Sequence, residues 1–525
     1  MTALHRPSRP LTALCCTLAV AGAVAVAPSA PAVAQDSPFL TVVDSFQAGE
    51  FDDGGAEIPT FDPKTGRFFV TNGSESAVDV LELRSGGLVR VAQLDVPAVT
   101  SIDVSSKGVL AVAVPSDPEQ APGQVRQYST KTLELRRVTT VGALPDMLTY
   151  TADGKQIVVA NEGEPSGYRV GDVDPVGSIS VIDAASGKVR TAGFTEFNGQ
   201  QGALTARGVR ISGPGASVAQ DLEPEYVALS ADGRTAYVAL QENNALALVD
   251  LKTATVTDIR PLGLKDHAAP GNGFDASDRD SKIDIRSRPT KGMFMPDGID
   301  AYTAADGREY VVTANEGDGR DYPGFTDEAR VRDVVLDPAA FPNAAALQRN
   351  SELGRLRVTT TSPRDAAGRY TALHTFGARS FSIRDASGAL VFDSGDSFEQ
   401  ITAEALPLSF NSNNDNNASR DSRSDDKGPE PEGVELGEVD GRTYAFIGLE
   451  RVGGIMVFDV TTARSPVFVD YVVTRDFGVA ADSAGAGDLG PEGLSFVPSQ
   501  DSPTGKALLV VASEVSGTTT VFTVG

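Results

Sequence analysis

Short runs of alternating apolar and polar residues recur along the chain, and most are rich in β-branched side chains. In residues 149–160 two such runs flank Asp153-Gly154, a dipeptide that favours a tight turn between antiparallel strands. The same motif, two strands joined by a glycine-containing turn, recurs at 226–240, 299–313, 433–448 and 494–511, with weaker copies at 58–83 and 99–128. The pattern therefore predicts about seven antiparallel units and little helix.

Repetition of one antiparallel unit is typical of a β-propeller, in which each unit forms one blade. A pair of β-sandwiches fits the strands but not the repeated motif. We therefore expect an all-β fold, a seven-bladed β-propeller with long inserted loops on one face. Residues 39–43 are expected to complete the last blade beside 521–524 and so close the ring. The segments too long for plain turns, and therefore candidates for function, are 196–221, 265–291, 317–379 and 411–428.

Each of the five strongest hairpins opens with proline and an acidic residue, and its second strand ends on another acid. The two open ends of a hairpin lie side by side, because neighbouring strands are about 5 Å apart. Both carboxylates should therefore lie at the same end of their unit, around the central channel of the propeller. The predicted pairs are Asp146 with Glu162, Glu225 with Glu242, Asp297 with Glu316, Glu432 with Glu450, and Glu492 with Glu514.

Ten carboxylates at one channel mouth indicate a bound cation. Crowded carboxylates raise one another's pKa unless a positive charge neutralises them. The chain has only three histidines and two cysteines, so oxygen ligands dominate, and these suit Ca²⁺ best, with Mg²⁺ or another divalent ion as the alternative. We predict the ten acids as metal ligands, with Asn161, Asn243 and Asn315 as further oxygen donors. The alternative is that proline-acid pairs only start turns and keep the surface soluble.

Two polar loops bear on the cation prediction. Residues 275–281 resemble part of a calcium-binding loop, but the central glycine and the closing glutamate of an EF-hand are missing. A solvated loop is the better interpretation there. The asparagine-rich segment 411–417 leads into the proline-acid motif at Glu432, so we expect it at the channel mouth as a ligand loop.

Composition narrows the possible partners. The 525 residues carry a formal charge of −26, and 41% of them are hydrophobic, which is enough for a large core. The acid excess, together with the lack of basic patches interleaved with aromatic residues, argues against nucleic acid and anionic membrane surfaces as partners. No glycine-rich phosphate loop and no serine nucleophile elbow stands out in the sequence.

The first 34 residues have the three parts of a secretory signal peptide: a basic start with Arg6 and Arg9, an apolar run over 11–26, and Ala32-Val33-Ala34 as the cleavage site. Both cysteines lie in this segment, so residues 35–525 are expected to fold without disulfides as a single propeller domain. No later apolar run approaches the roughly 18 residues that a membrane span needs, and no anchor follows the last strand. We expect a secreted monomer.

Several motifs resemble those of a known family. The longest is residues 422–433, Ser-Arg-Ser-Asp-Asp-Lys-Gly-Pro-Glu-Pro-Glu-Gly, and shorter ones lie at 144–147, 160–164, 314–318 and 379–383. They resemble the choice-of-anchor I family, which includes proteins like the mesenchyme-specific cell-surface glycoprotein. The resemblance implies a secreted or surface propeller, linked in some members to biomineralisation and sometimes labelled alkaline-phosphatase-like. It supplies no established catalytic residues.

Three functions fit these observations. The first is a calcium-binding propeller without catalysis that binds a small-molecule or phosphorylated ligand, or a partner, at the acidic mouth. The second is a metal-dependent phosphoester hydrolase, in which clustered divalent ions hold the phosphate and activate water. Cations near the acidic motifs would then contact the phosphate, and the candidates are Arg320, Arg379, Lys427 and Arg451. The third is a scaffold whose acids only stabilise the blades. Whether the protein is an enzyme stays open at this point.

Overall fold

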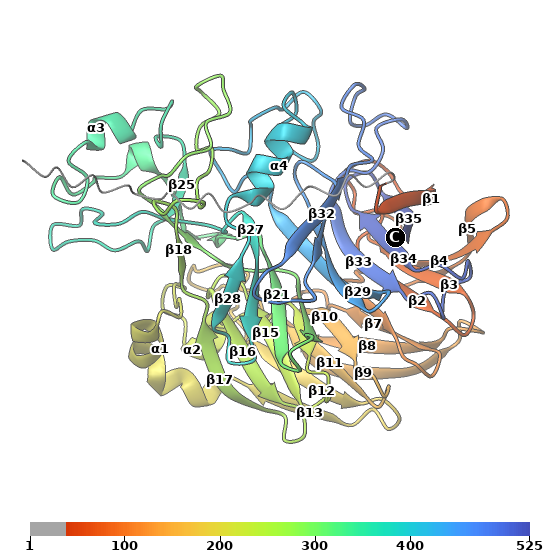
Figure 1. Cartoon of the computed structure of the whole chain (residues 1–525). Coiled ribbons are helices and arrows are strands. Elements are labelled where there is room, and N and C mark those ends of the chain that lie inside the picture. Colours follow the sequence, from red (N-terminus) through yellow and green to blue (C-terminus); the bar gives the residue numbers. More distant parts are fainter. Residues whose placement is uncertain (1–37) are drawn as a thin grey trace, which may run out of the picture. The chain divides into compact units, whose positions relative to one another are not determined.

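Seven four-stranded antiparallel sheets make up most of the computed structural model, which describes residues 38–525 (Figure 1). The first four sheets are β2 (Pro59–Asp62), β3 (Arg67–Asn72), β4 (Ala77–Arg84), β5 (Gly87–Asp95); β6 (Ile102–Val104), β7 (Val109–Val114), β8 (Pro122–Ser129), β9 (Leu135–Ala143); β10 (Pro145–Tyr150), β11 (Gln156–Asn161), β12 (Ser178–Asp183), β13 (Val189–Gly193); and β14 (Val227–Leu229), β15 (Thr235–Leu240), β16 (Ala245–Asp250), β17 (Thr255–Pro261). The others are β20 (Ile299–Thr303), β21 (Glu309–Asn315), β27 (Ser380–Asp385), β28 (Leu390–Asp393); β29 (Pro431–Val439), β30 (Arg442–Leu449), β31 (Ile455–Asp459), β32 (Val467–Val472); and β33 (Pro491–Val497), β34 (Leu508–Ser513), β35 (Thr518–Val524), β1 (Leu40–Gln47).

The turns form where the sequence predicts them. Tyr150 pairs with Ile157 across the β10–β11 hairpin, and Gly154 adopts φ +61°, a conformation that glycine reaches without steric cost. In the second strand of this hairpin, Ile157 to Ala160 are all buried, because a middle strand is covered on both faces by neighbouring sheets.

The sheets form a closed ring. Their first strands contact one another in the order β2, β6, β10, β14, β20, β29, β33 and back to β2. The last sheet takes its outermost strand from the other end of the described chain, since β1 pairs with β35 and Leu40 lies opposite Val524. This pairing confirms the predicted closure, and the all-β propeller fold is confirmed with it. The blade number of seven stays a prediction, with which the seven sheets agree.

The hydrophobic core lies between adjacent sheets. Ala113 and Val125 of the β6–β9 sheet pack with Leu148, Ile157 and Val159 of the β10–β13 sheet, and all five are buried. Burying a side chain of the size of Val, Leu or Ile contributes about 1.5–3 kcal/mol. Repeated around the ring, this packing fixes the inner strands that surround the channel.

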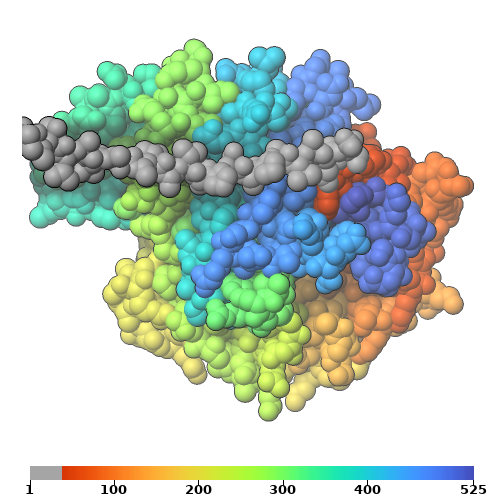
Figure 2. All heavy atoms as spheres, viewed as in Figure 1, coloured from red at the N-terminus to blue at the C-terminus, as the bar shows by residue number. Residues whose placement is uncertain are grey.

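The long insertions leave the propeller from one face, as predicted. Each connects the last strand of a sheet to the first strand of the next, or the second strand to the third, and in an up-and-down sheet these connections lie at the same end. Figure 2 shows the insertions that contain α3, residues 265–291, α4 and residues 473–490 as protrusions that follow one another in that order along one edge. Their elements are η1 (Thr195–Gln200), α1 (Gln201–Arg207), α2 (Val218–Asp221), β18 (Leu264–Asp266), β19 (Lys291–Met293), β22 (Asp321–Tyr322), β23 (Phe325–Thr326), β24 (Glu328–Arg330), η2 (Val331–Asp333), α3 (Ala344–Leu347), β25 (Arg357–Thr359), β26 (His374–Thr375) and α4 (Ser397–Ala405).

The predicted signal peptide, residues 1–34, lies outside the described residues. Within 38–525, the helices are all too short or too polar to cross a membrane.

Candidate functional site

The proline-acid motif places two carboxylates side by side. Pro145 lies opposite Asn161, so Asp146 and Glu162 leave their hairpin together. The register shifts between Pro145 and Leu148, and such a bulge re-aims the side chains of the bulged strand. The same pairing and the same shift occur in the hairpins of Glu432 with Glu450 and of Glu492 with Glu514.

A glycine after the first acid lets neighbouring hairpins approach closely. A Cβ atom on Gly298 or Gly433 would overlap the backbone carbonyl of Glu432 or Glu492, respectively. The backbone N–H of Gly298 donates a 3.1 Å hydrogen bond to the Glu432 carbonyl. Each acid-glycine pair therefore sets the position of the next acid around the ring.

The same contact identifies an acid that the sequence reasoning missed. The backbone N–H of Gly493 donates a 3.0 Å hydrogen bond to the carbonyl of Glu57, which follows Glu492 around the ring. Glu57 follows Ala56 and not a proline, so the proline-acid motif did not select it. The glycine contact makes Glu57 the corresponding acid of the first sheet.

Several carboxylates at the mouth have one buried oxygen without a hydrogen-bond partner in the described chain. Glu225, Glu242 and Glu450 are only 7%, 5% and 4% exposed. Among the described residues, no hydrogen-bond partner reaches one buried oxygen of each of these carboxylates: Glu225 Oε2, Glu242 Oε2, Glu432 Oε2, Glu450 Oε2 and Glu492 Oε2. A buried carboxylate oxygen without a partner is unfavourable, so these atoms call for a positive ligand or a proton.

The carboxylates also act on one another across the hairpins. Burial raises the pKa of Asp297 well above its usual range, and the charges of Glu316, Asp146 and Glu242 raise it further. Burial likewise raises the pKa of Glu432, and Glu450 and Glu316 add to that effect. The carboxylates whose pKa burial and neighbouring acids raise in this way include Asp146, Glu162, Glu225, Glu450, Glu492 and Glu514. The structure therefore brings all ten predicted acids into one electrostatically linked set.

More acids join this set than the hairpin motif predicts. Glu164 and Asp318 follow Glu162 and Glu316 by two residues, and Glu223 and Glu430 precede Glu225 and Glu432 by two. Glu223 is fully buried, and burial raises its pKa well above its usual range. These additional acids could have been found in the sequence from two repeated motifs, Glu-Pro-Glu and Glu-Gly-acid.

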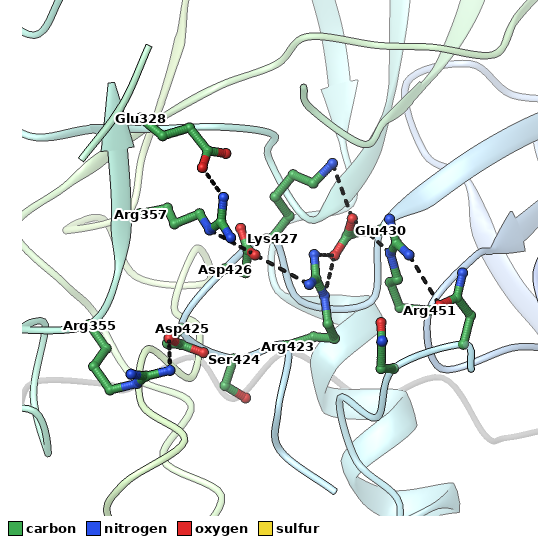
Figure 3. A network of polar contacts seen from close by, with 12 residues as sticks. Glu328, Arg355, Arg357, Arg423, Ser424, Asp425, Asp426, Lys427, Glu430 and Arg451 are labelled. Atoms are coloured by element: carbon green, nitrogen blue, oxygen red, sulfur yellow. Dashed lines mark hydrogen bonds and ion pairs between the residues drawn. The ribbon is translucent and has the colours of Figure 1, made fainter. Parts of the chain in front are cut away.

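Part of the negative charge is neutralised inside the protein. Figure 3 shows Arg423, Lys427 and Arg451 directed toward Glu430. Their nitrogen atoms lie 2.5, 3.1 and 3.2 Å from the Glu430 carboxylate, and the pKa of that buried group falls to about 2 because these cations outweigh burial. Lys427 Nζ also donates to Glu316 Oε1 at 2.8 Å. Glu430 is therefore a structural counter-ion.

The cations of the hydrolase hypothesis are all paired with carboxylates. Arg451 lies 2.9 Å from Glu450, in addition to its contact with Glu430. Arg320 is fully buried and lies 2.7 Å from Glu223. Arg379 lies 2.5 Å from Glu399, and its guanidinium stacks 4.4 Å from the ring centre of Phe274. These pairings favour structural roles, and only Lys427 and Arg451 contact predicted acids of the mouth.

Two groups of three carboxylates are close enough to share one ion, since each offers three oxygen atoms within 4.8 Å of one another. Glu316, Glu430 and Glu450 form one, but the cations around Glu430 already neutralise it. Asp297, Glu316 and Glu432 form the other. Within the described chain, Asp297 and Glu432 make no ion pair and only Glu316 has one, with Lys427 at 2.8 Å, so this second group is the better candidate for a cation site.

The asparagines do not supply the oxygen ligands that we predicted. Asn161 Oδ1 accepts from the backbone of Gly142, Asn315 Oδ1 accepts from Thr313, and Asn243 Oδ1 faces the Glu223 backbone N–H at 3.4 Å. Their amide groups thus hold the strand ends in place. Another asparagine does reach the mouth: Asn414 Nδ2 donates to Glu450 Oε1 at 3.0 Å, which confirms the expected position of the 411–417 segment.

The loop at 275–281 is held by the protein itself. Both oxygens of Asp275 accept backbone hydrogen bonds, from Ser277 and Asp284, and Asp278 pairs with Arg355 at 2.7 Å. The carboxylates of this loop thus hold the insertions together. The prediction that the loop is solvated is wrong for Asp275, which is fully buried.

A second set of acids, on the first strands of the sheets, differs from the acids of the channel mouth in its hydrogen bonds. Asp103 accepts from the backbone N–H of Tyr150, Asp300 from Leu436 and Glu435 from Phe496, at 2.7, 3.1 and 2.9 Å. Each bond joins the first strand of one sheet to that of a neighbouring sheet. These acids have backbone partners, whereas the acids of the mouth lack them.

Together, the ring of sheets and the ten acids define a β-propeller whose channel mouth concentrates carboxylates. The chain belongs to the choice-of-anchor I family, whose domain model matches residues 57–463.

Two curated relatives are similar to this chain. Gigasin-3a of Magallana gigas is 30% identical over 188 residues, which are 34% of this chain and 66% of that protein. The mesenchyme-specific cell surface glycoprotein of Strongylocentrotus purpuratus is 30% identical over 282 residues, 47% of this chain and 36% of that protein. The chain thus spans less than two thirds of each. Among solved structures, Kuenenia stuttgartiensis hydrazine synthase aligns with 91% of this chain and 97% of its own, at 14% identity and a TM-score of 0.48.

The raised pKa values predict a stability that falls with pH. Burial raises the pKa of Asp146 and Glu57 to about 7, well above the values in the unfolded chain, so the folded protein retains protons that the unfolded chain loses. In chelator, the melting temperature should fall as pH rises from about 5 to 8, and Asp146→Asn should flatten this dependence. Asp153→Asn, at the exposed turn of the same hairpin, is the control that should keep it. A melting temperature that rises over this interval in chelator would contradict the interpretation.

Proposed function

We propose that this protein is a secreted β-propeller that binds a divalent cation, most simply Ca²⁺, and uses it to hold a ligand or partner at the acidic channel mouth. The observation that carries this proposal is the group of buried carboxylate oxygens without partners, which converge from separate hairpins. Binding a cation there satisfies both the missing contacts and the mutual repulsion.

Asp297, Glu316 and Glu432 are the proposed centre of the cation site. The oxygen donors come from two neighbouring sheets, and the acid-glycine contact between Gly298 and Glu432 fixes their spacing. The fit to Ca²⁺ rests on this donor set, which is made only of carboxylates. Bound Ca²⁺ accepts six to eight oxygen ligands, so a ligand with hydroxyl, carboxyl or phosphoryl oxygens can complete the shell.

Export is part of the same proposal. The relative from Strongylocentrotus purpuratus is a cell surface glycoprotein by name, and the sequence of residues 1–34 has the pattern of a signal peptide. We propose that residues 35–525 form one exported propeller domain that acts as a monomer. A secreted protein whose N-terminus still includes residues 1–34 would contradict this part.

Calcium should stabilise the folded protein, because it binds the folded carboxylate group and not the separated acids of the unfolded chain. We expect excess Ca²⁺ to raise the melting temperature by several degrees above that in chelator, and Glu432→Gln to remove most of this shift. Glu438→Gln is the matched control, since Glu438 is exposed on the same strand. An unchanged melting temperature in excess chelator and in Ca²⁺ would contradict cation binding.

A metal-dependent phosphoester hydrolase is the second candidate. Lys427 and Arg451 favour it, because they contact acids of the mouth and offer positive charge beside the cation site. Against it, both are already neutralised by Glu430, Glu316 and Glu450.

Turnover of p-nitrophenyl phosphate with Ca²⁺, Mg²⁺ or Mn²⁺ separates the two candidates. The binding function predicts no metal-dependent turnover above that of Glu432→Gln. Turnover that Glu316→Gln and Glu432→Gln both abolish, and that Glu438→Gln leaves intact, would instead establish the hydrolase.

A further inference from the structure

The charged groups that line one pocket are all cationic, which is unusual in a chain of charge −26. The pocket has a volume of about 310 Å³ and lies between the β6–β9 and β10–β13 sheets, which are neighbours in the ring (Figure 1). Its lining includes Lys107, Arg136 and Arg137. Gly154 also lines it, at the turn opposite the open end that carries Asp146 and Glu162, so this basic pocket is distant from the channel mouth.

The backbone holds two of these cations in place without neutralising them. Lys107 Nζ donates to the carbonyl of Gly154 at 2.9 Å, and Arg137 donates to the carbonyls of Ser186 and Ala185 at 2.7 and 2.9 Å. Within residues 38–525, none of the three cations of the pocket forms an ion pair. Their positive charge is therefore available to an anion, and the carbonyl contacts position it beforehand.

The floor of the pocket offers a buried polar atom without a partner. Gln127 is 4% exposed, and its Nε2 donates to the carbonyl of Ala184 at 3.1 Å and to the Tyr150 hydroxyl oxygen at 3.4 Å. Its Oε1 has no hydrogen-bond partner in the described chain. Ser105 and Tyr150 bring hydroxyl groups to the same pocket. An unused acceptor beside two hydroxyls suits the hydroxyl groups of a ligand.

The next boundary around the ring shows that this cationic lining is specific. There, a pocket of about 370 Å³ is lined by Asp153, Asp183 and Asp232, with Lys155 as its cation. Asp183 also lies near Arg137, but its carboxylate bonds to Ser186 and does not line the basic pocket. The repeat alone therefore does not produce a basic pocket.

We infer that the basic pocket is a binding site for a sugar that carries an anionic ester, either sulfate or phosphate. Lys107, Arg136 and Arg137 contact the ester oxygens, since guanidinium groups match such oxyanions. Gln127, Ser105 and Tyr150 contact the hydroxyls. A bare oxyanion would leave much of the volume unfilled, whereas a pocket of this size accommodates a monosaccharide.

Calorimetric titration of the full chain with N-acetylglucosamine 6-sulfate, its 6-phosphate and the neutral sugar tests this inference. We expect one or both esters to bind with a dissociation constant below about 1 mM, and the preferred ester identifies the class. Arg136→Glu should weaken binding at least about tenfold, and Lys107→Gln should also weaken it. Arg464→Glu, at an exposed arginine outside the pocket, makes the same charge change and should bind like the unmodified protein.

Two results would overturn the inference. One is the failure of both esters to bind the unmodified protein. The other is binding that the neutral sugar shares equally or that Arg136→Glu leaves unchanged. Because Arg136 and Lys107 are exposed, both variants should melt like the unmodified protein, so lost binding would not report unfolding. None of these outcomes depends on calcium at the channel mouth.

Discussion

Repulsion among buried carboxylates at the channel mouth is the constraint on which the rest of this site depends. Two unit charges 4 Å apart interact by about 4 kcal/mol at the effective dielectric constant of a protein near its surface. The mouth gathers ten acids from five hairpins, and Glu57, Glu223 and Glu430 join them. Such a set stays charged only beside positive charge; otherwise it takes up protons.

The protein meets this constraint in two ways. Around Glu430, three cations come from the segment 423–427 and from Arg451, and they lower the pKa of that acid to about 2. Asp297 and Glu432 make no ion pair within the described residues, although Lys427 contacts the third member of their group, Glu316, and burial keeps the pKa of Asp297 and Glu432 high. The asymmetry between these two groups separates a structural ion cluster from a candidate cation site.

Much of this arrangement was predictable from the sequence. Turns such as Asp153-Gly154 fixed the hairpins, and the acids at their open ends followed from antiparallel pairing. The features that could not be predicted from the sequence depend on contacts between hairpins. Glu57 lacks the preceding proline, and only its contact with Gly493 reveals its place in the ring.

The asparagines illustrate the opposite error. Asn161, Asn243 and Asn315 have a chemistry suited to calcium, but the strand ends beside them leave backbone groups that need partners, and their amides serve that need. Likewise, the ion pairs of Arg320 and Lys427 join residues about a hundred positions apart. No local pattern specifies such pairs, because the ring closure decides which insertions meet.

The central claim is that the carboxylates of Asp297, Glu316 and Glu432 bind a divalent cation. Crystals of the protein grown with Tb³⁺, an anomalous scatterer that replaces Ca²⁺, test it most directly. The account predicts an anomalous difference peak within coordination distance of these three carboxylates, absent from crystals of Glu432→Gln. A well-ordered channel mouth without such a peak at saturating Tb³⁺ would contradict it.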